Sequence, residues 1–70
     1  MTDKVQDALV ILRRKQVEAR TGLPRSSIYA AIAAGNFPTP ISLAEKSVGW
    51  LEHEIDAWIA ARVEASRKTA

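Results

Sequence analysis

The sequence predicts one small, mainly α-helical domain that also contains a small β-hairpin. Residues 14–21 and 25–34 are rich in helix-forming side chains, and a Gly-Leu-Pro tripeptide separates them. From Leu51 onwards apolar residues recur at intervals of three and four, as in a helix with one buried face. Residues 41–50 form two short alternating segments around a polar turn, which is the pattern of a hairpin.

Glycine and proline define the ends of the first two helices. Gly22 stands where a residue of positive φ ends a helix, so the first helix should end at Thr21. Pro24 suits the first turn of the second helix and holds Leu23 in the extended backbone that an N-cap requires. Gly35 closes the second helix. Two helices joined by so short a turn predict a helix-turn-helix, whose second helix has the size to enter a DNA major groove.

The second helix has two different faces. Ile28, Ala31 and Ile32 share one face, which we assign to the core. The opposite face is left free for a partner, and it carries Arg25, Ser26, Tyr29, Ala30 and Ala33. A hairpin that follows such a helix is a wing, so the pattern as a whole predicts a winged helix-turn-helix.

The remaining apolar residues belong to packing. The run at residues 9–12 is interpreted as a short strand, although its length also fits the beginning of a helix. Trp50 and Trp58 occupy core positions of the hairpin and of the third helix. We therefore expect them in the core, and not stacked on single-stranded nucleic acid.

Composition excludes several classes of protein. The 70 residues, 47% of them apolar, are enough for one domain, with an ordered core at about residues 9–65 and flexible termini. Cysteine is absent and His53 is the only histidine, so neither disulfides nor a metal site of the usual ligands is expected. No nucleophile–base set or phosphate-binding loop occurs, so we expect neither an enzyme nor a cofactor. The apolar run nearest the amino terminus, residues 8–12, is too short for a signal sequence or a membrane span, which predicts a cytoplasmic protein.

Positive charge is concentrated in the first half of the chain. Residues 1–35 carry six Lys/Arg against three Asp/Glu, a net +3, whereas residues 36–70 carry four against five, a net −1. Within thirteen residues only Glu18 opposes a basic cluster made of Arg13, Arg14, Lys15, Arg20 and Arg25. Such a cluster suits a polyanion such as DNA, and an ordinary solvated face is the alternative interpretation.

Three strings of residues occur in order over most of the chain. They are TGLPRSSIY at 21–29, GxFPxPIxL at 35–43 and VGWLExEIDAW at 48–58. In this order and spacing they resemble the AlpA family of phage and prophage transcriptional regulators. The resemblance implies a MerR-like or excisionase-like winged helix-turn-helix, acting as a transcription regulator or as an excisionase of a prophage or integrative element. Family members often carry basic residues where this chain has Ala30 and Ser47, which implies fewer or shifted DNA contacts.

Eight residues are candidate contacts to double-stranded DNA. They are Arg14, Lys15, Gln16, Arg25, Ser26, Ser27, Tyr29 and Lys46. Those at the start of the first helix would bind phosphates, and Lys46 at the hairpin tip would touch the flanking backbone. Arg25 can bond a guanine edge or a phosphate. The two serines can donate to DNA or to their own backbone, and Tyr29 can reach a phosphate or serve packing alone.

Two hypotheses follow from this pattern. The first is a sequence-specific DNA-binding protein that associates with the nucleoid and works with integrase or RNA polymerase. The second is a protein-interaction module, because alanines make the second helix smooth and weakly polar. Only residues 66–70 are expected to follow the third helix, so the long dimerising helix of MerR-type regulators is not predicted. We therefore expect a monomer in solution that assembles cooperatively on DNA.

Overall fold

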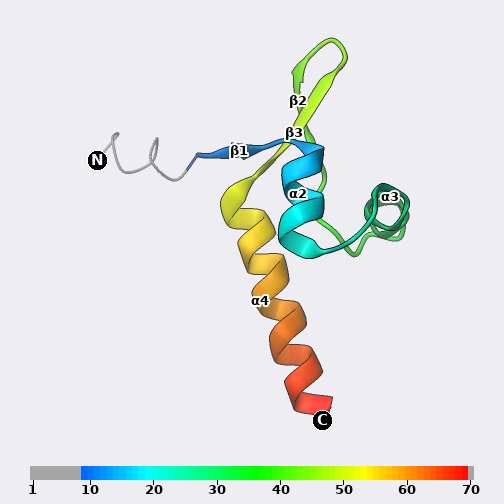
Figure 1. Ribbon diagram of the computed structural model, residues 1–70, viewed down its shortest axis with the longest axis vertical. Coiled ribbons are helices and arrows are strands. Elements are labelled where there is room, and N and C mark those ends of the chain that lie inside the picture. The colour runs from blue at the N-terminus through cyan, green and yellow to red at the C-terminus, as the bar shows by residue number, and fades with distance from the viewer. Residues whose placement is uncertain (1–8, 70) are drawn as a thin grey trace.

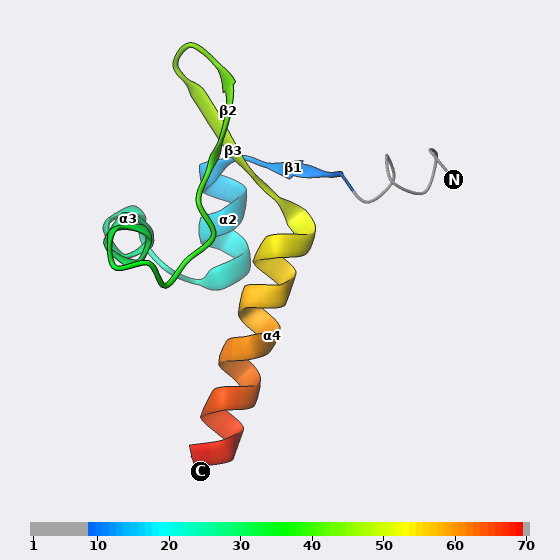
Figure 2. The same cartoon turned by 180° about the vertical axis from the view of Figure 1, so that it is seen from behind.

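The computed structural model describes residues 9–69, and the predicted flexibility of residues 1–8 and 70 concerns residues outside this range. Its elements are β1 (Ile11–Leu12), α2 (Arg14–Thr21), α3 (Arg25–Ala33), β2 (Ile41–Ala44), β3 (Ser47–Leu51) and α4 (Glu52–Thr69). The hairpin β2–β3 projects at one end of the molecule, and α4 extends toward the other end (Figure 1). Seen from either side, α3 lies on one side of α2, with β1 and the first turns of α4 on the other (Figure 2). The prediction of a mainly helical domain with a small hairpin is confirmed.

Local interactions fix both ends of α2. The N–H of Arg13, the N-cap residue, donates to Oε1 of Gln16 over 2.8 Å. At the other end Gly22 adopts the left-handed conformation with φ 75°, and its N–H donates to the carbonyl of Glu18. A β-carbon would strain this backbone, so glycine ends the helix at Thr21 as the sequence predicts.

The turn into α3 differs in one detail from the expectation. Pro24 itself is the N-cap, with φ −73° and ψ 165°, whereas the sequence had pointed to Leu23. Pro24 can take this position because its ring fixes a φ that is compatible with extended backbone, and its carbonyl accepts the N–H of Ile28. The helix ends at Ala33, one residue earlier than expected, and Gly35 follows with φ 78°.

The three strands form one antiparallel sheet in the order β1-β3-β2. The hairpin was predicted, but the pairing of β1 with β3 was not, and β1 is shorter than the expected strand at 9–12. Leu12 pairs with Trp50 on the face toward the helices, and both side chains are buried. The other face presents Ile11, Ile41 and Leu43, all of them exposed apolar side chains.

Gly49 allows side chains of the two outer strands, Ile11 and Leu43, to pack over β3. A β-carbon at this position would lie 2.5 Å from Cγ2 of Ile11 and 3.1 Å from the carbonyl oxygen of Leu12. The first distance is shorter than any normal contact, so a larger residue would require the side chain of Ile11 to move. This close approach explains why the middle strand has no side chain here.

The core contains one residue from each helix, two from the sheet and one from the segment between α3 and β2. Its buried members are Leu12, Val17, Ile28, Phe37, Trp50 and Ile55. The indole N–H of Trp50 donates to the carbonyl of Pro38 over 3.0 Å, so the polar atom of this buried ring is satisfied. Trp58 packs at the edge of the core and is only partly buried. The structure therefore confirms the core position of Trp50, whereas Trp58, also expected in the core, packs against its edge.

The last helix is longer than the sequence suggested. α4 continues to Thr69, so residues 66–69, expected to follow the helix, belong to it. Its first turns pack on the body of the domain through Ile55, while Val63 and other residues of the second half are exposed. The apolar spacing could not mark its end, because the alanines in the second half suit a buried or an exposed helix equally. None of the helices within residues 9–69 is long and apolar enough to cross a membrane.

Candidate nucleic-acid interface

The outward face of α3 is exposed along its length. The side chains expected there are all exposed, namely Arg25, Ser26, Tyr29, Ala30 and Ala33. On the opposite side Ile28 is fully buried, with Ala31 and Ile32 packed against the core. Ser27 is only half-buried at the boundary between these faces, so it is less accessible than the neighbouring serine. The helix has no acidic residue, and it lies at the edge of the domain (Figure 1).

Arg25 and Tyr29 form a unit on this face. They stand one turn apart, and the guanidinium carbon of Arg25 lies 5.8 Å from the centroid of the Tyr29 ring. The ring of Tyr29 in turn meets that of Trp50 edge-on, at 6.5 Å and 63°. Because Trp50 is part of the core, this chain of contacts limits the directions that Arg25 can take. Its N–H groups can still bond a carboxylate, a phosphate or a base edge in two-point fashion.

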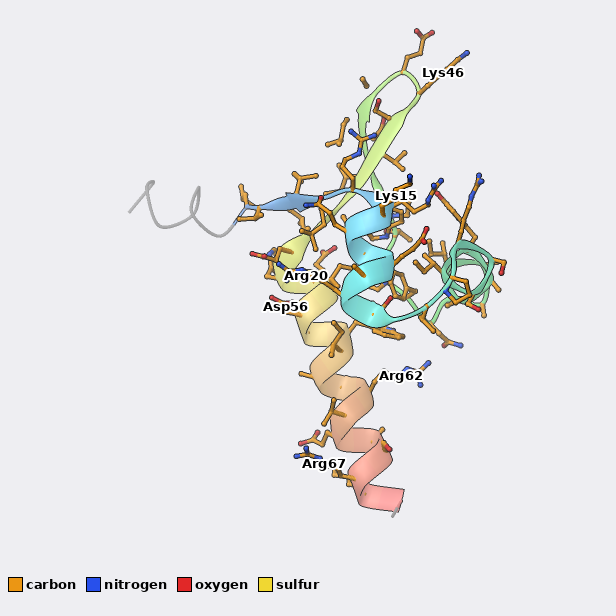
Figure 3. The ribbon with its side chains drawn as sticks, viewed as in Figure 1. Lys15, Arg20, Lys46, Asp56, Arg62 and Arg67 are labelled. Carbon is orange, nitrogen blue, oxygen red and sulfur yellow. The ribbon has the colours of Figure 1, made fainter. Side chains whose placement is uncertain are left out.

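The amino end of α2 supplies further donors. Lys15 is exposed and extends from α2 on the side where α3 lies (Figure 3). Arg14 is half-buried, and its Nε lies 3.0 Å from a carboxylate oxygen of Glu18, which offsets part of its charge. Gln16 uses its Oε1 to cap the helix, which leaves its amide nitrogen as the free donor. Lys15 is therefore the strongest of the three candidates for an anion.

Lys46 stands apart from the other candidates. It occupies the tip of the hairpin and is exposed, next to an equally exposed Glu45 (Figure 3). Lys15 extends toward the side of the domain on which α3, the helix of Arg25 and Tyr29, lies, whereas Lys46 is at the end of a projecting arm. A ligand bound at α3 can also contact Lys46 only if it extends beyond this helix, as a DNA duplex does.

Arg20 does not belong to the basic cluster in which the sequence had placed it. Its NH2 lies 2.6 Å from Glu52 and its NH1 3.1 Å from Asp56, both at the start of α4. Arg20 and Asp56 also lie on the side of the molecule away from α3 (Figure 3). The partners are 32 and 36 residues distant in the chain, so no local pattern could have revealed them. The positive charge available to a ligand is correspondingly smaller.

Other kinds of site find no support in residues 9–69. No three His, Cys, Asp or Glu side chains of this range are grouped so that they could hold a metal ion. The buried side chains of the same range are all apolar. What the surface offers is a set of exposed hydrogen-bond donors and positive charges around α3.

Comparison with known proteins places the chain in a family. The sequence profile described as Prophage CP4-57 regulatory protein (AlpA) matches residues 10–63. The chain belongs to the AlpA family. This result confirms the resemblance, the winged helix-turn-helix fold and the prediction that the chain is not an enzyme, because AlpA proteins are regulators.

Two relatives extend the comparison. The chain is 38% identical over 63 residues to the DNA-binding transcriptional activator AlpA of Escherichia coli, an alignment that covers 81% of this chain and 90% of that protein. It is 47% identical over 57 residues to the ORF88 protein of Enterobacteria phage P4, which covers 81% of this chain. The alignment spans 64% of the length of the phage protein, so that relative is longer than the shared AlpA domain.

Proposed function

We propose that this AlpA-family protein binds double-stranded DNA in a sequence-specific manner through α3. The observation that carries the proposal is the exposed, acid-free face of α3, with Arg25 at its start and Lys15 of α2 on the same side. A helix held in this way can enter a major groove of about 12 Å width. The relative in Escherichia coli, named a DNA-binding transcriptional activator, supports the same conclusion.

Each candidate residue has a proposed part in this complex. Arg25 contacts a base edge, and Ser26 and Ser27 donate to bases or to nearby phosphates. The hydroxyl of Tyr29 reaches a phosphate, because this side chain is exposed on the outward face of α3. The phosphates beside the groove are bound by a second set, consisting of Arg14, Lys15 and Gln16 from α2 and Lys46 from the wing.

The biological outcome is regulation within a prophage or an integrative element. The proposed contacts serve a transcription regulator, with RNA polymerase as protein partner, and they serve equally an excisionase that acts with an integrase. In either role the protein works in the bacterial cytoplasm on the nucleoid.

The salt dependence of binding tests whether DNA is the ligand. With phosphate contacts from Arg13, Arg14, Lys15 and Lys46, and with the positive charge of Arg25 inside the groove, the log–log slope of the association constant against salt should lie at about −3 to −5. Fluorescence anisotropy with a labelled duplex at several salt concentrations measures this slope. A nearly flat response would contradict the proposal, and a shuffled duplex of equal length separates specific from general binding.

One observation favours a second candidate function. Ala30 and Ala33 make the exposed face of α3 smooth, and the outer face of the sheet exposes Ile11, Ile41 and Leu43. A protein-interaction module would use such surfaces to accept a helix of another protein. That module would bind duplex DNA weakly and without sequence preference, so the same titration with specific and shuffled duplexes distinguishes the two functions.

We also propose that the protein is a monomer in solution and assembles cooperatively on DNA. A single helix in one groove discriminates only a few base pairs, each by about 1 to 3 kcal/mol, so several copies are needed to select a site. Contacts between copies would use the exposed sheet face. The acidic start of α4 is less suitable as a contact surface, because Glu52 and Asp56 are already paired with Arg20. Sedimentation at micromolar concentration should show a monomer, and DNase footprinting should show protection of direct repeats. A stable free dimer on one palindrome would contradict this proposal.

A further inference from the structure

We propose that Arg62 of α4 is an additional phosphate-binding residue, which contacts the DNA backbone on the side of α3 opposite the wing. The inference rests on the proposed function, since it requires α3 to lie in a major groove. A helix in this groove has a phosphate backbone on each side of it. The amino end of α2 and the wing serve one of these backbones, and Arg62 serves the other.

Long-range packing places this part of α4 next to the end of α3. The indole N–H of Trp58 donates to the carbonyl of Asn36, the third residue after α3, over 2.6 Å. The ring of Trp58 also meets that of Phe37 edge-on, with their centroids 4.8 Å apart. These two contacts fasten the middle of α4 to the segment that leaves α3, so side chains here keep a fixed relation to the groove-binding helix.

Arg62 lies one turn beyond Trp58 and uses its ring as a support. The guanidinium carbon is 5.1 Å from the centroid of the indole ring, within the range of a cation–π contact. Among residues 9–69 no carboxylate lies within ion-pair distance of Arg62, in contrast to Arg14 and Arg20. A guanidinium held over a ring can still direct N–H groups outward, and these groups match the oxygens of a phosphate.

The direction of the side chain agrees with this role. Arg62 points toward the side of the molecule on which α3 lies, whereas Arg67 on the same helix points the other way (Figure 3). An open groove beside Arg62 is lined by Asn36, Trp58, Ala61 and Ala65. The alanines leave space for the ligand, and the exposed amide of Asn36 adds a second donor.

The dimensions of the domain fit contacts on both sides of one groove. The molecule is 40 Å long, with the wing at one end, the tail of α4 at the other and α3 between them (Figure 1). The major groove is only about 12 Å wide, so a domain of this length can contact both backbones beside it. Arg62 lines the same groove as Asn36, the third residue after α3, and this position would bring it to the second backbone.

A pair of matched variants tests the proposal. Arg62→Gln and Arg67→Gln remove the same charge from the same helix, and glutamine keeps the aliphatic stem and a high helix propensity. We expect Arg62→Gln to weaken binding to specific and shuffled duplexes alike, by about 3- to 10-fold at low salt, and to reduce the salt slope by about 0.9. Arg67→Gln should stay within about twofold of the parent protein. Arg62→Lys keeps the charge and should restore most of the affinity.

The outcomes separate this inference from the proposed function. Equal losses for Arg62→Gln and Arg67→Gln would assign the effect to net charge and overturn the inference, as would binding by Arg62→Gln that equals that of the parent. If the parent protein itself shows a flat salt response, the proposed function fails and the Arg62 contact fails with it. Thermal unfolding of both variants by circular dichroism shows whether a loss of affinity comes from a loss of folding.

Discussion

Replacing Trp50 by Ala is expected to leave the chain largely unfolded at 25 °C. Trp50 is fully buried and belongs to the core, where its strand pairs with Leu12 and its indole N–H bonds the carbonyl of Pro38. Loss of a buried aromatic side chain costs about 3 to 5 kcal/mol, and a domain of this size has little more stability than that in total. The free energy of unfolding, measured by urea titration followed by circular dichroism, checks this expectation.

Two further variants make the result specific. Trp50→Phe keeps an aromatic ring and loses the indole N–H, so it should fold with a smaller loss of stability, about 1 to 2 kcal/mol. Trp58→Ala should also cost less than Trp50→Ala, because Trp58 is only partly buried, although it loses the bond to Asn36. A Trp50→Ala protein that folds normally and fails only in DNA binding would show that the ring serves a binding surface and not the core.

The contrast between these tryptophans illustrates what the sequence could predict. Spacing placed both rings on the apolar side of their elements, and the structure agrees. Spacing alone could not tell that α4 leaves the body of the domain soon after Trp58, so that this ring lies at the edge of the core. Burial at such a position depends on which distant residues cover it, here Phe37 and Asn36.

Features determined by local backbone chemistry were predicted well. Gly22 and Gly35 end their helices because their positive φ angles are unfavourable for residues with a β-carbon. The hairpin follows from two alternating segments close in the chain. The strand β1 is different, because its two residues become a strand only by pairing with β3, almost forty residues later. Its short apolar run is compatible with several structures, and only the tertiary contact selects one of them.

The candidate site likewise combines features that the local sequence predicts with features that depend on distant residues. Local periodicity correctly gave the exposed face of α3, and most of the predicted contacts are accessible there or at the start of α2. Charges were harder to interpret, because their availability depends on partners from other elements. Arg20 is neutralised by Glu52 and Asp56. The guanidinium of Arg62 is held over the ring of Trp58, which packs at the end of α3. Neither relation leaves a signal in the neighbouring sequence.

Arg25→Ala is expected to have the largest effect on sequence preference of any single change in the interface. If Arg25 bonds a guanine edge at two points, its loss should weaken binding to the specific site by about 1 to 3 kcal/mol and flatten the preference at one base pair. Binding to shuffled duplexes should fall much less. Titration of a set of duplexes, each changed at one base pair, measures both quantities.

Lys15→Ala provides the comparison for Arg25→Ala, since each change removes one positive charge from the side of the domain where α3 lies. Lys15 lies on α2, outside the helix proposed to enter the groove, so its loss should weaken binding to all duplexes alike and reduce the salt slope by about 0.9. Arg25→Lys separates charge from geometry, because lysine keeps the charge and cannot form the two parallel bonds of a guanidinium. It should retain general affinity and lose the base preference. If Arg25→Ala weakens binding to every duplex equally, Arg25 is a phosphate contact, and the bases must be recognised by other residues on the face of α3, of which Ser26 is the exposed candidate.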